Sequence, residues 1–110
     1  MRRLQVAFAN PYQKFYSVFG FFPKELTTDL RQKIGSNKGM LVFAVRKGSP
    51  AFQADILAGD IVKKIGDIEM IDLKSVDDAA GVNACKQVTI LLLRDGKEIT
   101  KEIQCDSLPY

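Results

Sequence analysis

Few side chains in this sequence of 110 residues could carry out chemistry. There is no histidine, so His-dependent catalytic triads and His-ligated zinc sites are excluded, and two cysteines cannot build a zinc site from cysteine alone. The central carboxylates form neither a catalytic pair nor a calcium loop, and we interpret them as solvated surface and turn residues: Asp55, Asp60, Asp67, Glu69 and Asp72. The sequence therefore predicts no enzyme, no metal site and no cofactor.

The two cysteines, Cys85 and Cys105, have a spacing that permits a disulfide. Asp95-Gly96 predicts a two-residue turn, and counting outward from it places residue 86 opposite residue 105, so that Cys85 lies one residue from opposite Cys105. A bond requires Cα atoms within about 7 Å. Both alternatives stay open, a disulfide or two free thiols.

The most unusual stretch is S17-V-F-G-F-F-P23, in which three phenylalanines surround one glycine and a proline follows. A soluble protein rarely places so much apolar surface in a short segment without burying it or using it. Taken alone, V18-F-G-F21 is either an ordinary buried strand with a glycine bulge or part of a binding site.

Composition bounds the class of protein. Hydrophobic residues make up 46% of the chain, which predicts one compact domain with a core. The net charge is +3 and the basic residues are scattered, so nucleic-acid binding is not predicted. No apolar run approaches the roughly 18 residues that span a bilayer, and the apolar part of M1-R-R-L-Q-V-A-F-A9 is too short for a signal peptide.

Near the end of the chain, V88-T-I-L-L-L-R94 and K97-E-I-T-K-E-I-Q104 flank Asp95-Gly96 and predict a β-hairpin with a type I′ turn. The first strand is nearly all apolar, which predicts burial on both faces. The second strand alternates, with Ile99 and Ile103 on one face.

The remaining elements are predicted from short apolar runs and cap residues. Thr27 or Thr28 caps the first helix and Gly35 ends it, Ser49 caps the second, and Ser75 caps the third. In the second helix, Ala51, Ala54 and Leu57 are expected on one side. The ranges are strands at 39–46 and 61–65 and helices at 27–34, 48–57 and 75–84.

This order of elements resembles the PDZ domains of bacterial envelope proteins, such as periplasmic serine proteases of the high-temperature-requirement family and secreted PDZ lipoproteins. The resemblance covers about residues 16 to 104 through these stretches: L26-T-T-D-L-R-Q-K-I-G35, G39-M-L-V-F-A-V45, G48-S-P-A51, A54-D-I-L-A-G-D-I-V62, S75-V-D-D78 and L93-R-D-G-K-E-I-T100. It implies an α+β fold, with a partly closed antiparallel sheet of five or six strands capped by two main helices plus a short extra helix.

The resemblance also implies a function, the capture of a C-terminal or internal extended peptide by β-augmentation in a groove between a strand and a helix. By position, the N–H groups of Phe19, Gly20 and Phe21 resemble the loop that binds the peptide carboxylate, and Lys14 could add positive charge. The resemblance implies that the groove is lined by Val18, Phe21, Phe22, Val76, Ala80 and Asn83.

Two residues bear on ligand choice. Pro23 occupies the strand position whose N–H would bond the peptide, so the groove either lacks one donor or is blocked. Val76 stands where relatives that prefer Ser or Thr carry histidine, which predicts a carboxyl-terminal tail of the form Φ-x-Φ, where Φ is an apolar residue. The alternative is that Val76 packs in the core.

We expect a domain at residues 14–105, an N-terminal extension at 1–13 and a tail at 106–110. The resemblance implies a periplasmic or envelope location, in which a disulfide could form. Expected partners are protein or peptide C-termini with an apolar last residue, without nucleic acid or a membrane span. The alternatives are a substrate-sensing fragment of a protease, or a structural domain whose groove holds a neighbouring chain or its own tail.

Overall fold

The computed structural model describes residues 16, 19–82 and 87–104. These residues form six strands and three helices with defined bounds. The strands are β1 (Phe21–Glu25), β2 (Met40–Val45), β3 (Ile61–Ile65), β4 (Ile68–Glu69), β5 (Gln87–Arg94) and β6 (Lys97–Gln104); the helices are α3 (Thr28–Ile34), α4 (Pro50–Gln53) and α5 (Leu73–Val82).

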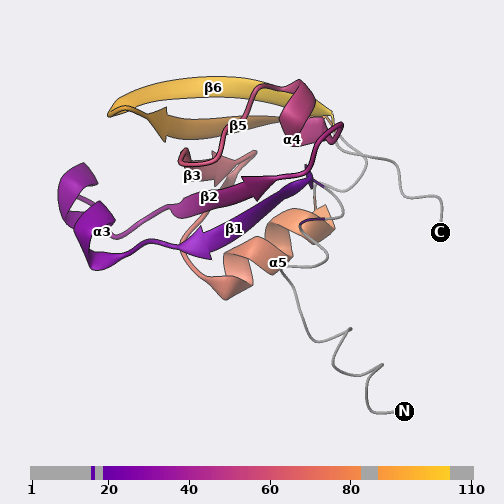
Figure 1. The fold of residues 1–110 in the computed structure, drawn as a ribbon. Coiled ribbons are helices and arrows are strands. Elements are labelled where there is room, and N and C mark those ends of the chain that lie inside the picture. The colour runs from indigo at the N-terminus through magenta and orange to yellow at the C-terminus, as the bar shows by residue number, and fades with distance from the viewer. Residues whose placement is uncertain (1–15, 17–18, 83–86, 105–110) are drawn as a thin grey trace, which may run out of the picture.

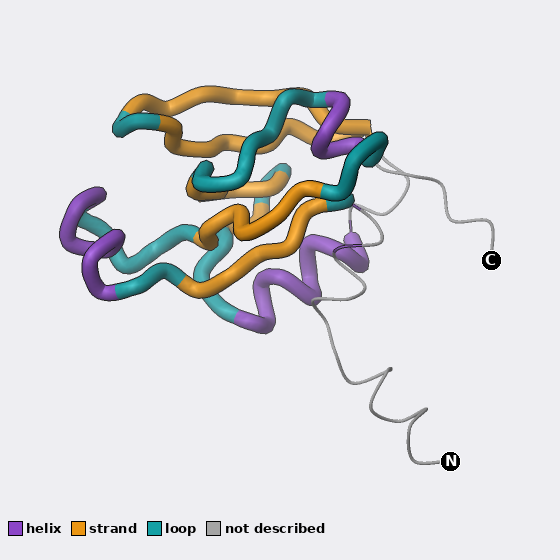
Figure 2. The backbone as a smooth tube through the Cα atoms, viewed as in Figure 1, coloured by secondary structure: helices purple, strands orange, loops and turns teal. Residues whose placement is uncertain are grey.

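The strands form one antiparallel sheet in the order β1-β2-β3-β5-β6, with the short β4 paired to β3. Figure 1 shows α5 running beside β1 at one side of the sheet and α4 near the β5–β6 hairpin at the other. Helix α3 connects the end of β1 to the start of β2, beyond the edge of the sheet (Figure 2), and buries none of its residues. This arrangement confirms the predicted α+β fold and resolves the number of strands to six.

The core lies on the inner face of the curved sheet. Val88, Ile90 and Leu92 alternate inward along β5 and belong to the same core cluster as Val76 and Ala79 of α5. The remaining members are Phe19, Phe21, Met40, Val42, Ala51, Ile56, Val62, Ile65, Met70 and Ile103. The first two phenylalanines of the opening stretch are thus both completely buried.

The β5–β6 hairpin forms as predicted. Asp95 and Gly96 have φ angles of 55° and 79°, the positive values that a type I′ turn requires. The prediction that β5 is buried on both faces was wrong, because Thr89 is exposed and Leu91 and Leu93 are only half-buried. Among the described residues, the outer face of the sheet is covered much less than the inner face. The apolar run of β5 was therefore no evidence that both faces of this strand are buried.

Two of the predicted helices differ in their ends. Helix α4 covers one turn only, because Asp55 adopts a left-handed φ of 65°, and Leu57 is 47% exposed instead of facing the core. Ser75 does not cap α5. Asp72 does, since its Oδ1 accepts from Ser75 N–H at 3.0 Å while Ser75 Oγ accepts from Asp72 N–H at 3.0 Å.

Asp60 corrects the interpretation of the central carboxylates as solvated. It is 2% exposed and accepts from Arg94 Nη2 at 2.7 Å, from Arg94 Nε at 2.9 Å and from Leu57 N–H at 2.9 Å. This hydrogen bonding raises the pKa of Arg94. The pair joins the start of β3 to the end of β5 and holds the hairpin onto the rest of the sheet.

Candidate functional site

Strand β1 is an edge strand, paired with β2 on one side only among the described residues. Arg46 N–H donates to Gly20 C=O at 2.7 Å, and the register continues through Phe21↔Val45 and Phe22↔Ala44. The backbone N–H and C=O groups of successive residues point to opposite edges of a strand. Those of Gly20 and Phe22 therefore point toward β2, whereas those of Phe21 and the C=O of Pro23 point toward the open edge. Pro23 therefore costs no bond to β2, and it removes a donor from the open edge instead.

The bend that leads into β1 depends on Gly20. Its φ is +90°, and a Cβ placed there would lie 2.1 Å from Cβ of Ser49. Ser49 is completely buried; its Oγ donates to Gly20 C=O at 3.3 Å and accepts from Phe52 N–H at 3.1 Å, capping α4. The G48-S-P-A51 segment thus fixes the loop, a role that its sequence alone did not indicate.

The amide of Gly20 already has a hydrogen-bond partner within the chain. Tyr16 and Phe19 have helical backbone, and Gly20 N–H donates to Tyr16 C=O at 2.9 Å. A carboxylate that took up this N–H would have to replace the Tyr16 carbonyl. In the predicted carboxylate-binding loop of Phe19, Gly20 and Phe21, the central N–H group is therefore already engaged in a hydrogen bond within the chain.

The predicted groove residues separate onto different sides of the fold. Phe21 and Val76 are completely buried in the core, which for Val76 is the alternative left open from the sequence. Phe22 lies on the opposite face of β1, where its ring contacts Tyr16 and Phe43 at centroid distances of 6.3 and 6.4 Å. Phe22 consequently does not line a groove on the side of Val76.

Several predicted site residues fall outside the part of the chain that the structure describes. They are Lys14, Val18, Asn83, Cys85 and Cys105. Ala80 belongs to α5, but its side chain is not among those described. The charge at the carboxylate loop, part of the groove lining and the possible disulfide stay predictions.

The outer face of β1 and β2 carries a group of aromatic and basic side chains that was not predicted from the sequence. Lys24 Nζ lies 4.5 Å from the Phe43 ring centroid, and Arg46 Cζ lies 5.7 Å from that of Tyr16. We call this group the outer-face cluster; its members are Tyr16, Phe22, Lys24, Phe43 and Arg46. Phe43 projects from the outer face because its neighbour Val42 points into the core, and the register shift between Phe22 and Pro23 leaves Phe43 without a partner on β1.

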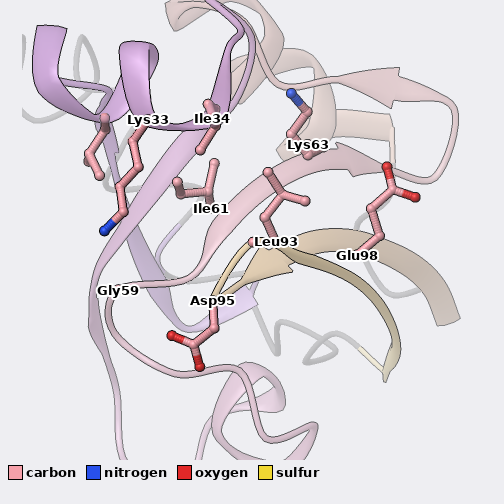
Figure 3. Close-up of a pocket in the computed structure, with 10 residues that line it drawn as sticks. Lys33, Ile34, Gly59, Ile61, Lys63, Leu93, Asp95 and Glu98 are labelled. Atoms are coloured by element: carbon pink, nitrogen blue, oxygen red, sulfur yellow. The ribbon is translucent and has the colours of Figure 1, made fainter.

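A separate cavity of about 630 Å³ lies between α3 and the outer face of the sheet (Figure 3). Leu30 and Ile34, four residues apart on α3, face Ile61 and Leu93 across it. Its rim carries Lys33 and Lys63 with Asp95 and Glu98. Only the Leu30–Ile34 spacing hinted at this cavity, and none of the predicted site residues lines it.

Comparison with known proteins gives a consistent relationship. Over 69 residues, 60% of this chain, the sequence is 35% identical to "Serine protease Do-like HtrA" of Lactococcus lactis subsp. lactis (strain IL1403), of which it covers 16%. The protein of that name from L. lactis subsp. cremoris (strain MG1363) matches with the same identity and coverage, 35% over 69 residues. The chain thus spans 16% of the length of these curated relatives.

Solved structures share the fold. The HtrA-type protease AlgW with a tripeptide superposes with a TM-score of 0.71 at 25% identity, over 84% of this chain and 32% of that one. The HtrA3 PDZ domain bound to a phage-derived ligand (FGRWV) gives a TM-score of 0.67 at 19% identity, over 80% of this chain and 83% of that one.

The described residues contain no helix long and apolar enough to cross a membrane. The similarity is to the PDZ part of these proteases, which is not catalytic. The sequence matches the family described as "PDZ domain" over residues 20–105, most of its length. The chain belongs to the PDZ domain family.

Proposed function

We propose that this chain captures the C-terminal segment of a protein or peptide as an added antiparallel strand on β1. The observation that carries the proposal is the geometry of β1, an edge strand whose outward backbone positions follow directly on the bend at Gly20. Edge pairing supplies main-chain hydrogen bonds, and pockets on either side supply specificity. Membership of the PDZ family supports the same function.

We place the peptide carboxylate at the loop of Phe19, Gly20 and Phe21, with Lys14 contributing charge. Because Gly20 N–H donates to Tyr16 C=O, carboxylate binding would require this N–H to change partner. The wall opposite β1 would come from α5, through Val76, Ala80 and Asn83, with Val18 and Phe21 at the loop end. Binding would therefore involve a local change in the hydrogen bond between Tyr16 and Gly20.

An apolar last residue, with a second apolar residue two positions before it, is the tail that we propose. The residue that would contact the second of these side chains is Val76, which is completely buried in the core and would have to be uncovered as the ligand binds. Peptides ending in Val-x-Val should then bind more tightly than peptides ending in Thr-x-Val. Tighter binding of the threonine peptide would show that the polar residue has a partner here.

Similarity to HtrA-type proteases favours one second candidate, a PDZ domain that presents or senses substrates for a protease. We propose a periplasmic or envelope location for both candidates, and attachment as a lipoprotein belongs to the first, the stand-alone binding module. Self-association through the groove is the third form of the same binding. The length of the parent gene separates the first two, and sedimentation with and without Leu108-Pro109-Tyr110 tests the third.

The test of the proposed function changes the ligand and leaves the protein intact. A C-terminal peptide library is screened, and the best peptide is then compared with the same peptide carrying a C-terminal amide. Hydrogen bonds to a charged group are worth roughly 1.5–3 kcal/mol, so the amide should bind about tenfold more weakly or worse. Equal binding of the two forms would show that no carboxylate is recognised.

A substitution at Gly20 is a poor control for this experiment. Because a Cβ there would collide with Ser49, a Gly20→Glu protein would lose binding through damage to the fold alone. The amide peptide avoids this ambiguity.

A further inference from the structure

We propose that the cavity between α3 and the sheet binds a dipeptide that has aliphatic side chains and two free termini. None of the described residues placed at the peptide groove lines this cavity, so the site is separate from the open edge of β1. The inference does not depend on the proposed function. It adds a second binding site and a ligand of a different kind.

The cavity is formed before any ligand arrives, because both ends of α3 are anchored. Leu26, just before the helix, is 4% exposed. After the helix, Lys63 Nζ donates to Lys38 C=O at 2.9 Å and to Ser36 Oγ at 3.3 Å. Helix α3 is thereby held over the sheet with none of its residues buried. The cavity that this leaves, about 630 Å³, lies in the range of roughly 300–1,000 Å³ typical of ligand sites.

The apolar lining of the cavity is aliphatic. Ile61 of β3 and Leu93 of β5 are directly opposite each other, so their side chains stand together on the outer face. Leu30 and Ile34 face them from α3 and are only half-buried. A ligand with aliphatic side chains would remove apolar surface of all four residues from water.

Charged side chains surround this lining, and the two signs come from different sides (Figure 3). The cations, Lys33 and Lys63, belong to α3 and β3. The carboxylates, Asp95 and Glu98, belong to the β5–β6 hairpin. Among the described residues, none of these four takes part in an ion pair. A ligand that carries an ammonium group and a carboxylate at opposite ends would therefore match the cavity in one direction, with its carboxylate toward the lysines.

The separation of the charges favours a dipeptide over smaller and larger zwitterions. In a single amino acid both charged groups are attached to one carbon atom, so they cannot face opposite sides of the cavity. An extended dipeptide spans roughly 7 Å and carries two side chains for the aliphatic lining. A longer peptide would extend beyond the charged rim, and its terminal charges would lie in solvent.

The test adds Leu-Leu to the ¹⁵N-labelled chain and follows the amide signals by NMR. The amides of Ile34, Ile61 and Leu93 should shift, with a dissociation constant on the order of 1 mM for so small a ligand. N-acetyl-Leu-Leu and Leu-Leu amide each lack one terminal charge and should bind roughly 2- to 10-fold more weakly. Leucine and Gly-Gly should also bind more weakly than Leu-Leu, because the first lacks the charge separation and the second lacks the side chains.

Variants with matched controls connect each ligand end to its side of the cavity. Asp95→Asn combined with Glu98→Gln removes both carboxylates, and Asn-Gly also suits a type I′ turn. In this variant, acetylation of the ligand should no longer weaken binding, whereas amidation still should. Lys33→Gln should diminish the effect of amidation alone. The control variant, Lys97→Gln with Glu102→Gln, changes charges on β6 outside the cavity lining and should keep both effects.

The outcomes separate this inference from the proposed function. Equal binding of Leu-Leu and its two blocked forms would overturn the inference, and so would the absence of shifts at the cavity. Shifts confined to Gly20–Phe22 would place the dipeptide at the carboxylate loop, which would refute the inference and support the proposed function. Capture of longer C-terminal peptides along β1 is measured separately and can fail or succeed without affecting the cavity.

Discussion

The two edge strands of the sheet, β1 and β6, differ in length, charge and cover. Strand β6 has eight residues and exposes Lys97, Glu98 and Glu102, whereas β1 has five and presents Phe22 and Pro23 before its first charge. Charged side chains on an edge discourage pairing with another chain, and short length with one proline is a weaker protection. The comparison indicates that β6 is an edge closed to partners and β1 an edge kept open for one.

The turns that lead into the two edges differ in the same sense. Gly96 begins β6 from an open hairpin turn, where an added Cβ would have no atom within 4 Å. Gly20 begins β1 from a bend packed against buried Ser49. The loop at β1 is therefore built into the core, and the turn at β6 is a simple connection.

The largest predicted effect is on the bend at Gly20, which leads into β1. Gly20→Ala should lower the free energy of unfolding by about 2–5 kcal/mol, because strain at positive φ adds to the collision with Ser49. Gly96→Ala, at a similar φ of 79° but without a collision, should cost only about 1–2 kcal/mol. Urea denaturation measures both, and equal losses would show that the Ser49 contact does not matter.

A smaller effect is predicted at Pro23. Pro23→Val restores an N–H on the open edge, so a carboxylate peptide should bind roughly 2- to 10-fold more tightly, corresponding to about 0.5–1.5 kcal/mol for one hydrogen bond. Stability should fall by roughly 0.4–1 kcal/mol, since proline restricts the unfolded chain. Affinity and stability would then move in opposite directions. Unchanged affinity would place the peptide elsewhere than along β1.

The smallest effect is predicted on β6. Replacing Lys97 and Glu102 together by threonine should produce weak self-association at high concentration, because the edge loses charge of both signs while net charge is kept. Sedimentation velocity measures it. The matched control replaces Lys38 and Glu69 by threonine. These two residues form an ion pair at 3.4 Å and belong to neither β1 nor β6, so this variant should stay monomeric like the wild type. Equal behaviour of the two variants would weaken the contrast between the edges.

Local signals predicted much of the fold. Asp95-Gly96 fixed the hairpin and its register, Thr27 and Gly35 bounded α3, and the G-S-P-A segment began α4. These features succeed because capping and turn geometry depend on neighbours within a few residues.

Features that depend on distant contacts were missed. The burial of Asp60 requires Arg94, 34 residues away, and the exposure of Leu91 and Leu93 depends on what covers the outer face. The outer-face cluster likewise depends on the pairing of β1 with β2, across which Phe43 lies beside Phe22 and Lys24. In the candidate site, the sequence located the bend at Gly20 but could not show that its N–H already has a partner.

The most direct test maps the binding edge by ¹⁵N NMR while a carboxylate peptide is titrated into the chain. We predict that the largest shift changes occur at the amides of Gly20–Phe22 and Lys24–Glu25 and along α5, with the amides of β6 unchanged. Changes concentrated on β6, or around the cavity between α3 and the hairpin, would contradict peptide capture along β1.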